Sequence, residues 1–527
     1  MTTLTQINPA TGDVLGDLPE WTSEQIRDAA ERARAAFPAW RDTPLAERLH
    51  CIRQMRQYLV DQADALAREI AQYTGKVPIE ALTHEILLVI DSLHYYEQHA
   101  PAILSTKKTK TPILLFGNHS YIEYKPMGVV AVIAPWNFPF LLSVVPAISA
   151  LIAGNTVLLK PSEAAPFMGK MFEAVFRASG FPDGVVQVVH GRGNVGAELI
   201  AAHPDKIFFT GSVATGKKIM SAAAENLIPC ELELGGKDPM IVFADCNLDR
   251  AARAAVWGAF TNAGQVCLSV ERVYVEESIY EPFMRKVREL TSALRLGVDY
   301  GSMTFPPQLA IVDAHLQDAL EKGAQVECGG RPLREGTLYY APTIVTGVDH
   351  SMRLMQEETF GPVMPVMTFR TEQEVIRLAN DTEYGLNASV WSQDLGKAKR
   401  VASALISGNV CINEVISSIG NMHLPFGGVK HSGMGAYHAE VGLRTFSHQT
   451  SVMVSKGTKP REINWYPYTQ DLYGSLHAII RLLYAPSKRW VGWPALRNLL
   501  RQVLDTYRYK GETSPPPQDV QKNNHSL

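Results

Sequence analysis

Three side chains of this sequence have the types needed for nucleophilic catalysis at a carbonyl carbon. Cys267 occurs in the segment NAGQVCL, Glu233 in LELGGK and Asn137 in PWNFP. A cysteine thiolate is a strong nucleophile that also leaves readily from a thioester. A carboxylate in a partly apolar pocket can activate water, and an amide N–H can stabilise an oxyanion. Together the three residues favour a reaction that passes through a thioester.

Each residue also has an ordinary structural interpretation. A lone cysteine between Val266 and Leu268 is often a small buried hydrophobic residue. Asn137 lies between two prolines, and asparagine is common in turns because it forms local hydrogen bonds. Glu233 could end a helix or form a surface ion pair, although the flanking leucines and glycines disfavour this. The combination, more than any single residue, indicates catalysis.

The three segments, in this order and with 267 − 233 = 34 residues between the glutamate and the cysteine, resemble the aldehyde dehydrogenase superfamily from about Ile7 to Met453. The resemblance implies NAD(P)-dependent oxidation of an aldehyde to a carboxylic acid. Cys267 would be the nucleophile, Glu233 the general base, and Asn137 with the Cys267 backbone N–H the oxyanion donors. Relatives that acylate coenzyme A generally lack this glutamate, so a free acid is the expected product.

A dinucleotide site is expected where a buried strand leads through a glycine turn into a helix. The segment FTGSVATG, residues 209–216, has this pattern, and we expect its helix to begin at Thr215 or Gly216. It departs from the usual G-x-G-x-x-G fingerprint because only Gly211 and Gly216 are present. A plain structural turn is the alternative.

The segment KPSE after a second buried strand strengthens this prediction, because Lys160 and Glu163 can reach ribose hydroxyls. A carboxylate there would repel a 2′-phosphate, so NAD is favoured, with NADP as the alternative. By resemblance, Glu358 binds the nicotinamide ribose and Phe360 flanks the ring. The remaining residues expected at the cofactor are Trp136, Ser162, Ser212, Leu234 and Gly235.

The residues that match the family's substrate tunnel are apolar in this sequence. They are Phe138, Leu141, Leu142, Val145, Val266 and Leu268. An apolar tunnel favours aromatic or medium-to-long aliphatic aldehydes. No arginine adjoins Cys267 to bind a substrate carboxylate, which disfavours a semialdehyde acid. A semialdehyde dehydrogenase of the same family and a catalytically silent scaffold remain the alternative functions.

The composition excludes several other classes of protein. The chain has 527 residues, of which 46% are hydrophobic and 20% charged, and a net charge of −3, so a nucleic-acid partner is not expected. Six scattered cysteines without paired spacing suit a reducing compartment and indicate no metal site. The N-terminus shows no secretory signal, so a cytoplasmic protein is expected.

Short apolar runs alternate with helix-like segments from Gly128 onward, which predicts α/β domains with parallel sheets. The charge-free stretch between Lys125 and Lys160 is punctuated by prolines and glycine, and we interpret it as strand, turn, helix and strand, not a membrane span. Helical spacing across residues 22–72 predicts two or three amphipathic helices.

By resemblance, the fold has a Rossmann-like NAD-binding domain, an α/β catalytic domain and a small oligomerisation β-flap. We assign residues 1–104 and 126–234 to the first, 235–440 to the second, and 105–125 with 441–458 to the flap. A homodimer or homotetramer is expected from the flap.

A C-terminal extension follows the usual family end. Residues 459–510 mix aromatic, aliphatic and basic residues, which predicts short helices that cover a neighbouring subunit or the substrate entrance. Peripheral contact with a membrane surface is the alternative. Residues 511–527 have the composition of a disordered tail.

Overall fold

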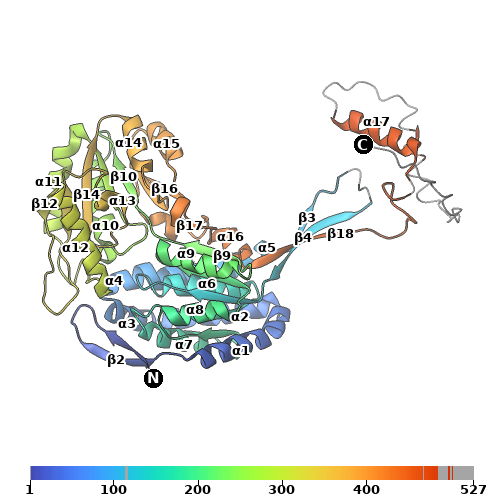
Figure 1. The fold of residues 1–527 in the computed structure, drawn as a ribbon, viewed down its shortest axis with the longest axis horizontal. Coiled ribbons are helices and arrows are strands. Elements are labelled where there is room, and N and C mark those ends of the chain that lie inside the picture. Colours follow the sequence, from blue (N-terminus) through green and yellow to red (C-terminus); the bar gives the residue numbers. More distant parts are fainter. Residues whose placement is uncertain are drawn as a thin grey trace, which may run out of the picture. The chain divides into compact units, whose positions relative to one another are not determined.

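The structure is a computed structural model that describes residues 2–112, 115, 117–466, 468–484, 497–498 and 501. It divides into two compact units, Met1–Ser105 with Glu123–Thr450, and Thr106–Ile122 with Ser451–Leu527. The first unit contains two sheets whose strands run mainly parallel, each covered by helices on both faces (Figure 1). The α/β fold class predicted from the sequence is therefore confirmed.

The first sheet has the strand order β17-β9-β8-β5-β6-β7. Its strands are β5 (Val129–Ile133), β6 (Thr156–Lys160), β7 (Val186–Val188), β8 (Lys206–Thr210), β9 (Cys230–Glu233) and β17 (Gly433–Met434). All neighbours pair in parallel except β17, which is antiparallel to β9. Strand β17 therefore joins this sheet although it follows the second sheet along the chain.

Alternate residues of β5 pack on opposite faces of this sheet. Val129 and Ala131 lie in the core shared with α1 (Ser23–Asp42), α8 (Gly193–Ala201) and α9 (Val213–Ala224). Val130 and Val132 lie in the core on the other face. Burial on both faces explains why the strand is a continuous apolar run instead of an alternating one.

Several helices cover the other face of this sheet. They are α2 (Leu45–Asp61), α3 (Ala63–Thr74), α5 (Leu87–Ile103), α6 (Leu141–Ile152) and α7 (Phe167–Ala178). Residues 22–72 thus form three helices, as the spacing predicts. Helix α6 lies inside the charge-free stretch, between β5 and β6. No helix among the described residues is long and apolar enough to span a membrane.

The second sheet has the order β12-β13-β14-β11-β10-β15-β16 and is parallel except for the β12–β13 pair. The strands are β10 (Pro239–Val242), β11 (Arg272–Glu276), β12 (Gln325–Cys328), β13 (Thr343–Thr346), β14 (Val363–Phe369), β15 (Asn387–Trp391) and β16 (Asn409–Ile412). Its helices include α10 (Leu248–Phe260), α11 (Tyr280–Ser292), α12 (Pro306–Glu321), α14 (Glu372–Asn380) and α15 (Leu395–Ala404).

A three-stranded sheet of order β18-β4-β3 contains the segments predicted to form the flap. Its strands are β3 (Lys107–Thr109), β4 (His119–Pro126) and β18 (Ser447–Val454). In the extension, helix α17 spans Gln470–Tyr484. Of the predicted helical extension, residues 467, 485–496, 499–500 and 502–510 lie outside the described residues, as does all of the predicted disordered tail.

Candidate functional site

Glu233 is the last residue of β9 and points its carboxyl group into a buried space. Its main-chain carbonyl accepts a hydrogen bond from the Gly211 N–H at 3.0 Å, and the next N–H donates to the Ser432 carbonyl at 2.9 Å. The side chain is buried, and neither carboxyl oxygen has a hydrogen-bond partner among the described residues. Burial, and then the charge of Glu231, raise its pKa well above the usual range. Once ionised, Glu233 would be a strong base.

The loop before Cys267 has an unusual backbone. After α10, a 3-10 turn spans Thr261–Gly264, and its residues Asn262, Ala263 and Gly264 have φ of 49°, 53° and 73°. Non-glycine residues rarely adopt this left-handed region, so the loop stores strain. A Cβ at position 264 would lie 2.1 Å from the Gly361 carbonyl oxygen. The glycine is therefore required both by conformation and by space.

The surroundings of Cys267 oppose ionisation of its thiol. Burial, and then the charges of Glu358, Asp238 and Glu233, raise its pKa. Cys267 is accordingly a thiol at neutral pH, and its conversion to the reactive thiolate needs a proton acceptor or a positive charge nearby. Since Glu233 contributes to this shift, the two side chains are close enough to influence each other electrostatically.

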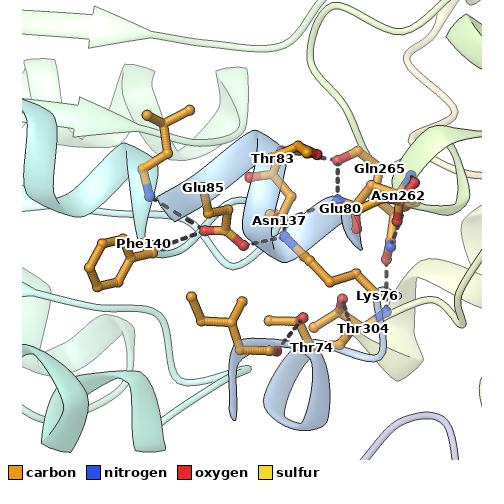
Figure 2. A network of polar contacts seen from close by, with 12 residues as sticks. Thr74, Lys76, Glu80, Thr83, Glu85, Asn137, Phe140, Asn262, Gln265 and Thr304 are labelled. Atoms are coloured by element: carbon orange, nitrogen blue, oxygen red, sulfur yellow. Dashed lines mark hydrogen bonds and ion pairs between the residues drawn. The ribbon is translucent and has the colours of Figure 1, made fainter. Parts of the chain in front are cut away.

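Asn137 lies on the loop between β5 and α6 and is joined to the Cys267 loop by hydrogen bonds (Figure 2). Its side-chain amide donates to the Gln265 carbonyl at 3.0 Å. Its main-chain carbonyl accepts hydrogen bonds from Asn262 Nδ2 at 3.0 Å and Lys76 Nζ at 2.8 Å. The amide nitrogen of Asn137 has two hydrogens, so one remains to be donated toward a reacting oxygen.

The three candidate catalytic residues line one cavity of about 650 Å³. Seven of the eleven residues predicted at the cofactor line it as well, namely Trp136, Gly211, Ser212, Leu234, Gly235, Glu358 and Phe360. The remaining four, Lys160, Ser162, Glu163 and Gly216, are not part of this lining. A Cβ at Gly216 would lie 2.7 Å from a Leu234 methyl group, so this glycine allows α9 to pack closely.

The cavity has the features that a dinucleotide requires. Helix α9 begins at Val213, earlier than the predicted Thr215 or Gly216, because the Ser212 hydroxyl caps it by accepting from the Thr215 N–H. Its N-terminus therefore opens onto the cavity beside Gly211, where backbone N–H groups suit a pyrophosphate. Elsewhere in the lining, the rings of Trp136 and Phe360 meet edge to face, with centroids 5.4 Å apart.

Glu358, predicted to bind the nicotinamide ribose, is a half-buried residue in the lining of this cavity. Oε1 accepts from the Gly236 N–H at 3.0 Å, and a Cβ at Gly235 would lie 2.2 Å from Oε2. Burial first, and then the charge of Glu271, raise the pKa of Glu358 to about 8. Its second oxygen is available to a ligand in the cavity.

Lys160 and Glu163 are neighbours, with Nζ and Oε2 3.6 Å apart. The lysine is buried, whereas the Glu163 side chain is 37% exposed. Burial lowers the pKa of Lys160, and the Glu163 carboxylate opposes that shift. The pair lies at the end of β6 and is not part of the lining of the large cavity. Its role at an adenosine ribose therefore stays a prediction.

A second, apolar pocket of about 60 Å³ also reaches Cys267. Five residues predicted for the substrate tunnel line it, namely Phe138, Leu141, Leu142, Val266 and Leu268. Val145, the sixth, is buried in α6 and is not part of the lining. Leu142 and Cys267 belong to both cavities, so the thiol lies where the two meet.

Sequence reasoning missed the residues that complete both cavities and support them. The apolar pocket also contains His84, Leu88, Trp257, Thr261, Ile416 and Ile419. The larger cavity also contains Pro135, Thr210, Val213, Ala214, Lys217, Gln308, Ile311, His315, Arg353, Glu357 and Tyr384. The sequence could have indicated some of them, because Thr210, Val213 and Ala214 lie inside the glycine-turn segment. Pro135 lies in the PWNFP segment and Lys217 directly follows the glycine turn, whereas most of the others come from distant elements and lack a local motif.

Comparisons with known proteins agree with this arrangement. Residues 1–452 match the sequence profile of the aldehyde dehydrogenase family. A 4,4'-diapolycopene aldehyde oxidase of Methylomonas is 45% identical over 489 residues, 92% of each chain. A putative succinate-semialdehyde dehydrogenase [NADP(+)] of Mycobacterium ulcerans is 36% identical, covering 85% of this chain and 87% of the relative.

Solved structures match as well. The NAD+ complex of an aldehyde dehydrogenase from Bacillus cereus aligns with a TM-score of 0.83 and 34% identity, covering 86% of this chain and 94% of the other. This chain therefore belongs to the aldehyde dehydrogenase family and is an NAD(P)-dependent oxidoreductase that acts on an aldehyde.

Proposed function

We propose that this enzyme oxidises an apolar aldehyde to the carboxylic acid through a thioester on Cys267. The observation that carries the proposal is the position of this thiol at the junction of a large cavity suited to a dinucleotide and a narrow apolar pocket. An aldehyde entering from the apolar side would present its carbonyl carbon to Sγ. Its C–H bond would face the larger cavity, where NAD or NADP accepts a hydride when bound.

In the first half of the reaction, the Cys267 thiol gives its proton to water, and Sγ adds to the carbonyl carbon. The resulting oxyanion is stabilised by the remaining N–H of the Asn137 amide and the Cys267 backbone N–H. Such donors are worth about 10²- to 10³-fold in rate when fixed where charge develops. Loss of hydride from the carbon then leaves the acyl group on sulfur as a thioester.

In the second half, water attacks the thioester, and Glu233 accepts the proton from that water. The C–S bond breaks, the carboxylic acid leaves and the cysteine is restored. The raised pKa of Glu233 supports this role, because a carboxylate with a higher pKa is a stronger base once it is ionised. Transfer of the acyl group to coenzyme A is the alternative that Glu233 disfavours.

NAD is the expected cofactor of choice. The exposed Glu163 carboxylate at the end of β6 would repel a 2′-phosphate if the adenosine ribose binds there, as the family resemblance implies. The nearby Lys160 reduces this repulsion, so we expect a preference for NAD rather than exclusion of NADP.

The apolar pocket supports a hydrophobic substrate. Apart from Cys267 and Thr261, its lining is aliphatic, aromatic or imidazole, and it contains no Asp, Glu, Lys or Arg. Burial lowers the pKa of His84 to about 4, so this imidazole is neutral at working pH. The name of the Methylomonas relative, an oxidase of 4,4'-diapolycopene aldehyde, agrees with an apolar substrate. A pocket without a cation would bind a semialdehyde carboxylate poorly.

The proposal is tested by initial rates of NADH and NADPH formation with decanal, cinnamaldehyde, benzaldehyde, acetaldehyde and succinic semialdehyde. We expect kcat/KM to be highest for decanal or cinnamaldehyde with NAD, and to vanish in Cys267→Ala. A preference for succinic semialdehyde would contradict the substrate class. Absence of any Cys267-dependent oxidation would instead favour the scaffold alternative.

A further inference from the structure

A fully buried ion pair lies behind the Asn137 loop without reaching either cavity. Lys76 Nζ bonds to Glu85 Oε1, and both side chains have no exposed surface (Figure 2). Lys76 follows α3, and Glu85 lies in a π-helical turn, Leu82–Ile86. Neither residue lines the cofactor cavity or the apolar pocket. Any effect of the pair on the reaction must therefore act through other residues.

The pair holds the Asn137 segment at both of its ends. Lys76 Nζ donates to the Asn137 main-chain carbonyl at 2.8 Å. Glu85 Oε2 accepts from the Phe140 N–H at 2.6 Å and from the Leu141 N–H at 3.4 Å. The ammonium group thus fixes the residue that carries the amide donor, while the carboxylate fixes the start of α6 three residues later.

The Asn137 main-chain carbonyl also links the ion pair to the nucleophile loop, the segment from Thr261 to Cys267. Asn262 Nδ2 donates to the Asn137 carbonyl at 3.0 Å and to the Gln265 carbonyl at 3.1 Å. The Asn137 amide donates to that Gln265 carbonyl at 3.0 Å. Lys76 and Asn262 therefore occupy both lone pairs of the Asn137 oxygen, and the plane of this peptide is fixed relative to the segment that leads to Cys267.

Stability alone is a weak reason for such a pair. Burying two charges costs much of what their attraction returns, and apolar replacements of similar volume are often as stable. The pair instead supplies directional bonds to a main-chain carbonyl and to N–H groups, which an apolar pair could not supply. Lys76 Nζ also lies 4.5 Å from the centre of the Phe138 ring, which lines the apolar pocket.

We propose that Lys76 and Glu85 are positioning residues that set the direction of the Asn137 side-chain amide, and thereby the strength of oxyanion stabilisation at Cys267. The inference rests on the proposed thioester mechanism, in which Asn137 is the oxyanion donor. It assigns a function in the reaction to two residues that touch neither substrate nor cofactor.

Two reactions of the same sulfur atom test the proposal without any cofactor. Acylation by p-nitrophenyl acetate develops an oxyanion, whereas alkylation by iodoacetamide displaces iodide and develops none. In Lys76→Met and Glu85→Gln we expect acylation to slow by about 10- to 100-fold, the size of effect that a misplaced group produces. Alkylation of Cys267 should change less than about twofold, because it needs no oxyanion donor.

Asn137→Ala provides the reference. It should slow acylation and spare alkylation in the same way, and adding Lys76→Met to it should cause little further loss, because both changes remove one function. If Asn137→Ala leaves acylation unchanged, the proposed mechanism fails at the oxyanion donor. If Asn137→Ala slows acylation but Lys76→Met and Glu85→Gln do not, only the positioning role fails.

Glu97→Gln is the matched control for loss of an ion pair near this region. Glu97 on α5 pairs with Arg56 on α2 at 2.6 Å, and neither residue lines a cavity. Its replacement should therefore leave the rates of acylation and alkylation unchanged. Should Lys76→Met fold poorly, Lys76→Met with Glu85→Gln removes both charges and keeps an acceptor for the Phe140 N–H. Equal loss of acylation and alkylation in correctly folded variants would overturn the proposal, because it would indicate general disorder of the site.

Discussion

Burial turns the carboxyl group of Glu358 into one that titrates within the working range. Its pKa of about 8 means that it is mainly protonated at pH 7 and ionised above pH 8. An ionised carboxylate accepts hydrogen bonds from ribose hydroxyls more strongly than a protonated one, which must also place its own hydrogen. If Glu358 binds the nicotinamide ribose, as the family resemblance implies, cofactor affinity should depend on pH through this residue.

We expect the Kd for NADH to fall as the pH rises from 7 to 9, by roughly threefold to tenfold. Glu358→Gln, which cannot ionise, should bind more weakly and lose this pH dependence. Fluorescence titration of NADH at fixed ionic strength measures both effects, with Glu335→Gln, at an exposed position outside the cavity lining, as the control. An unchanged pH dependence in Glu358→Gln would assign the titration to another group.

Among single residues, the sequence identified the three candidate catalytic side chains but not the buried residues that hold them in place. Asn137, Glu233 and Cys267 were predicted because short motifs surround them, and the structure brings all three to one cavity. Lys76, Glu85 and His84 were not predicted, since a buried ion pair or a neutral pocket histidine depends on packing between distant segments. Their roles follow from contacts that no local pattern records.

Two buried lysine–glutamate pairs each hold one loop of the site. Lys76 with Glu85 holds the Asn137 loop, whereas Lys237 with Glu271, at 2.5 Å, holds the loop at Phe360. The Glu271 carboxylate accepts from the Phe360 N–H at 2.9 Å, and Phe360 has a φ of 51°, a strained value for an aromatic residue. The second pair is thus an element of the cofactor side.

Lys237→Met should weaken the cofactor site in preference to the sulfur chemistry. Leaving Glu271 buried without its partner costs about 3–5 kcal/mol of folding stability, so the Tm should fall. We expect the KM for NAD to rise about tenfold while p-nitrophenyl acetate hydrolysis stays within about threefold of normal. Steady-state kinetics and thermal unfolding measure these values, and a selective loss of ester hydrolysis would contradict the assignment.

The nucleophile loop gives a further test of how one element of the fold controls the site. Gly264→Ala adds a Cβ that meets the Gly361 carbonyl, at a φ that disfavours alanine. We expect kcat for aldehyde oxidation to fall about 100-fold, because displaced catalytic groups cost that much. Gly193→Ala, at a position with open space, should behave as the parent protein. Normal activity of Gly264→Ala would show that the loop tolerates rearrangement.

The order of strands and helices was largely predictable from alternating apolar runs, because both sheets are buried on two faces. The start of α9 was placed too late, because Ser212 as a capping residue was overlooked. The two-residue strand β17 could not be predicted, since its pairing with β9 joins segments about two hundred residues apart. Only tertiary structure reveals such a contact.

At the scale of the whole molecule, strand β18 forms an edge of its three-stranded sheet among the described residues. It ends in Met453 and Val454, which are 56% and 43% exposed. An exposed apolar edge strand favours pairing with another chain. The proposed oligomerisation flap therefore has the expected surface for association of subunits.

Met453→Lys with Val454→Glu should shift the protein from an oligomer toward a monomer at micromolar concentration, because charges on an edge strand oppose pairing. Size-exclusion chromatography with light scattering measures the mass. Val298→Glu, which alters an exposed valine outside the three-stranded sheet, is the control. An unchanged mass in the double variant would place the subunit interface elsewhere.

The C-terminal extension is shared at least in part with one relative. The family profile ends at residue 452, whereas the Methylomonas alignment covers 489 residues, 92% of this chain. The two proteins are therefore similar beyond the family's usual end. Composition alone predicted short helices within residues 459–510, and α17 (Gln470–Tyr484) lies inside this range.

Cys267 is proposed to carry a thioester whose hydrolysis depends on Glu233 as the base, and Glu233→Gln tests this mechanism most directly. Mixed with NAD and excess decanal, this variant should release about one NADH per active site in a burst and then turn over slowly. Mass spectrometry should find the decanoyl group on the peptide that contains Cys267. Full steady-state turnover without this adduct, or an acyl group on another cysteine, would contradict the mechanism.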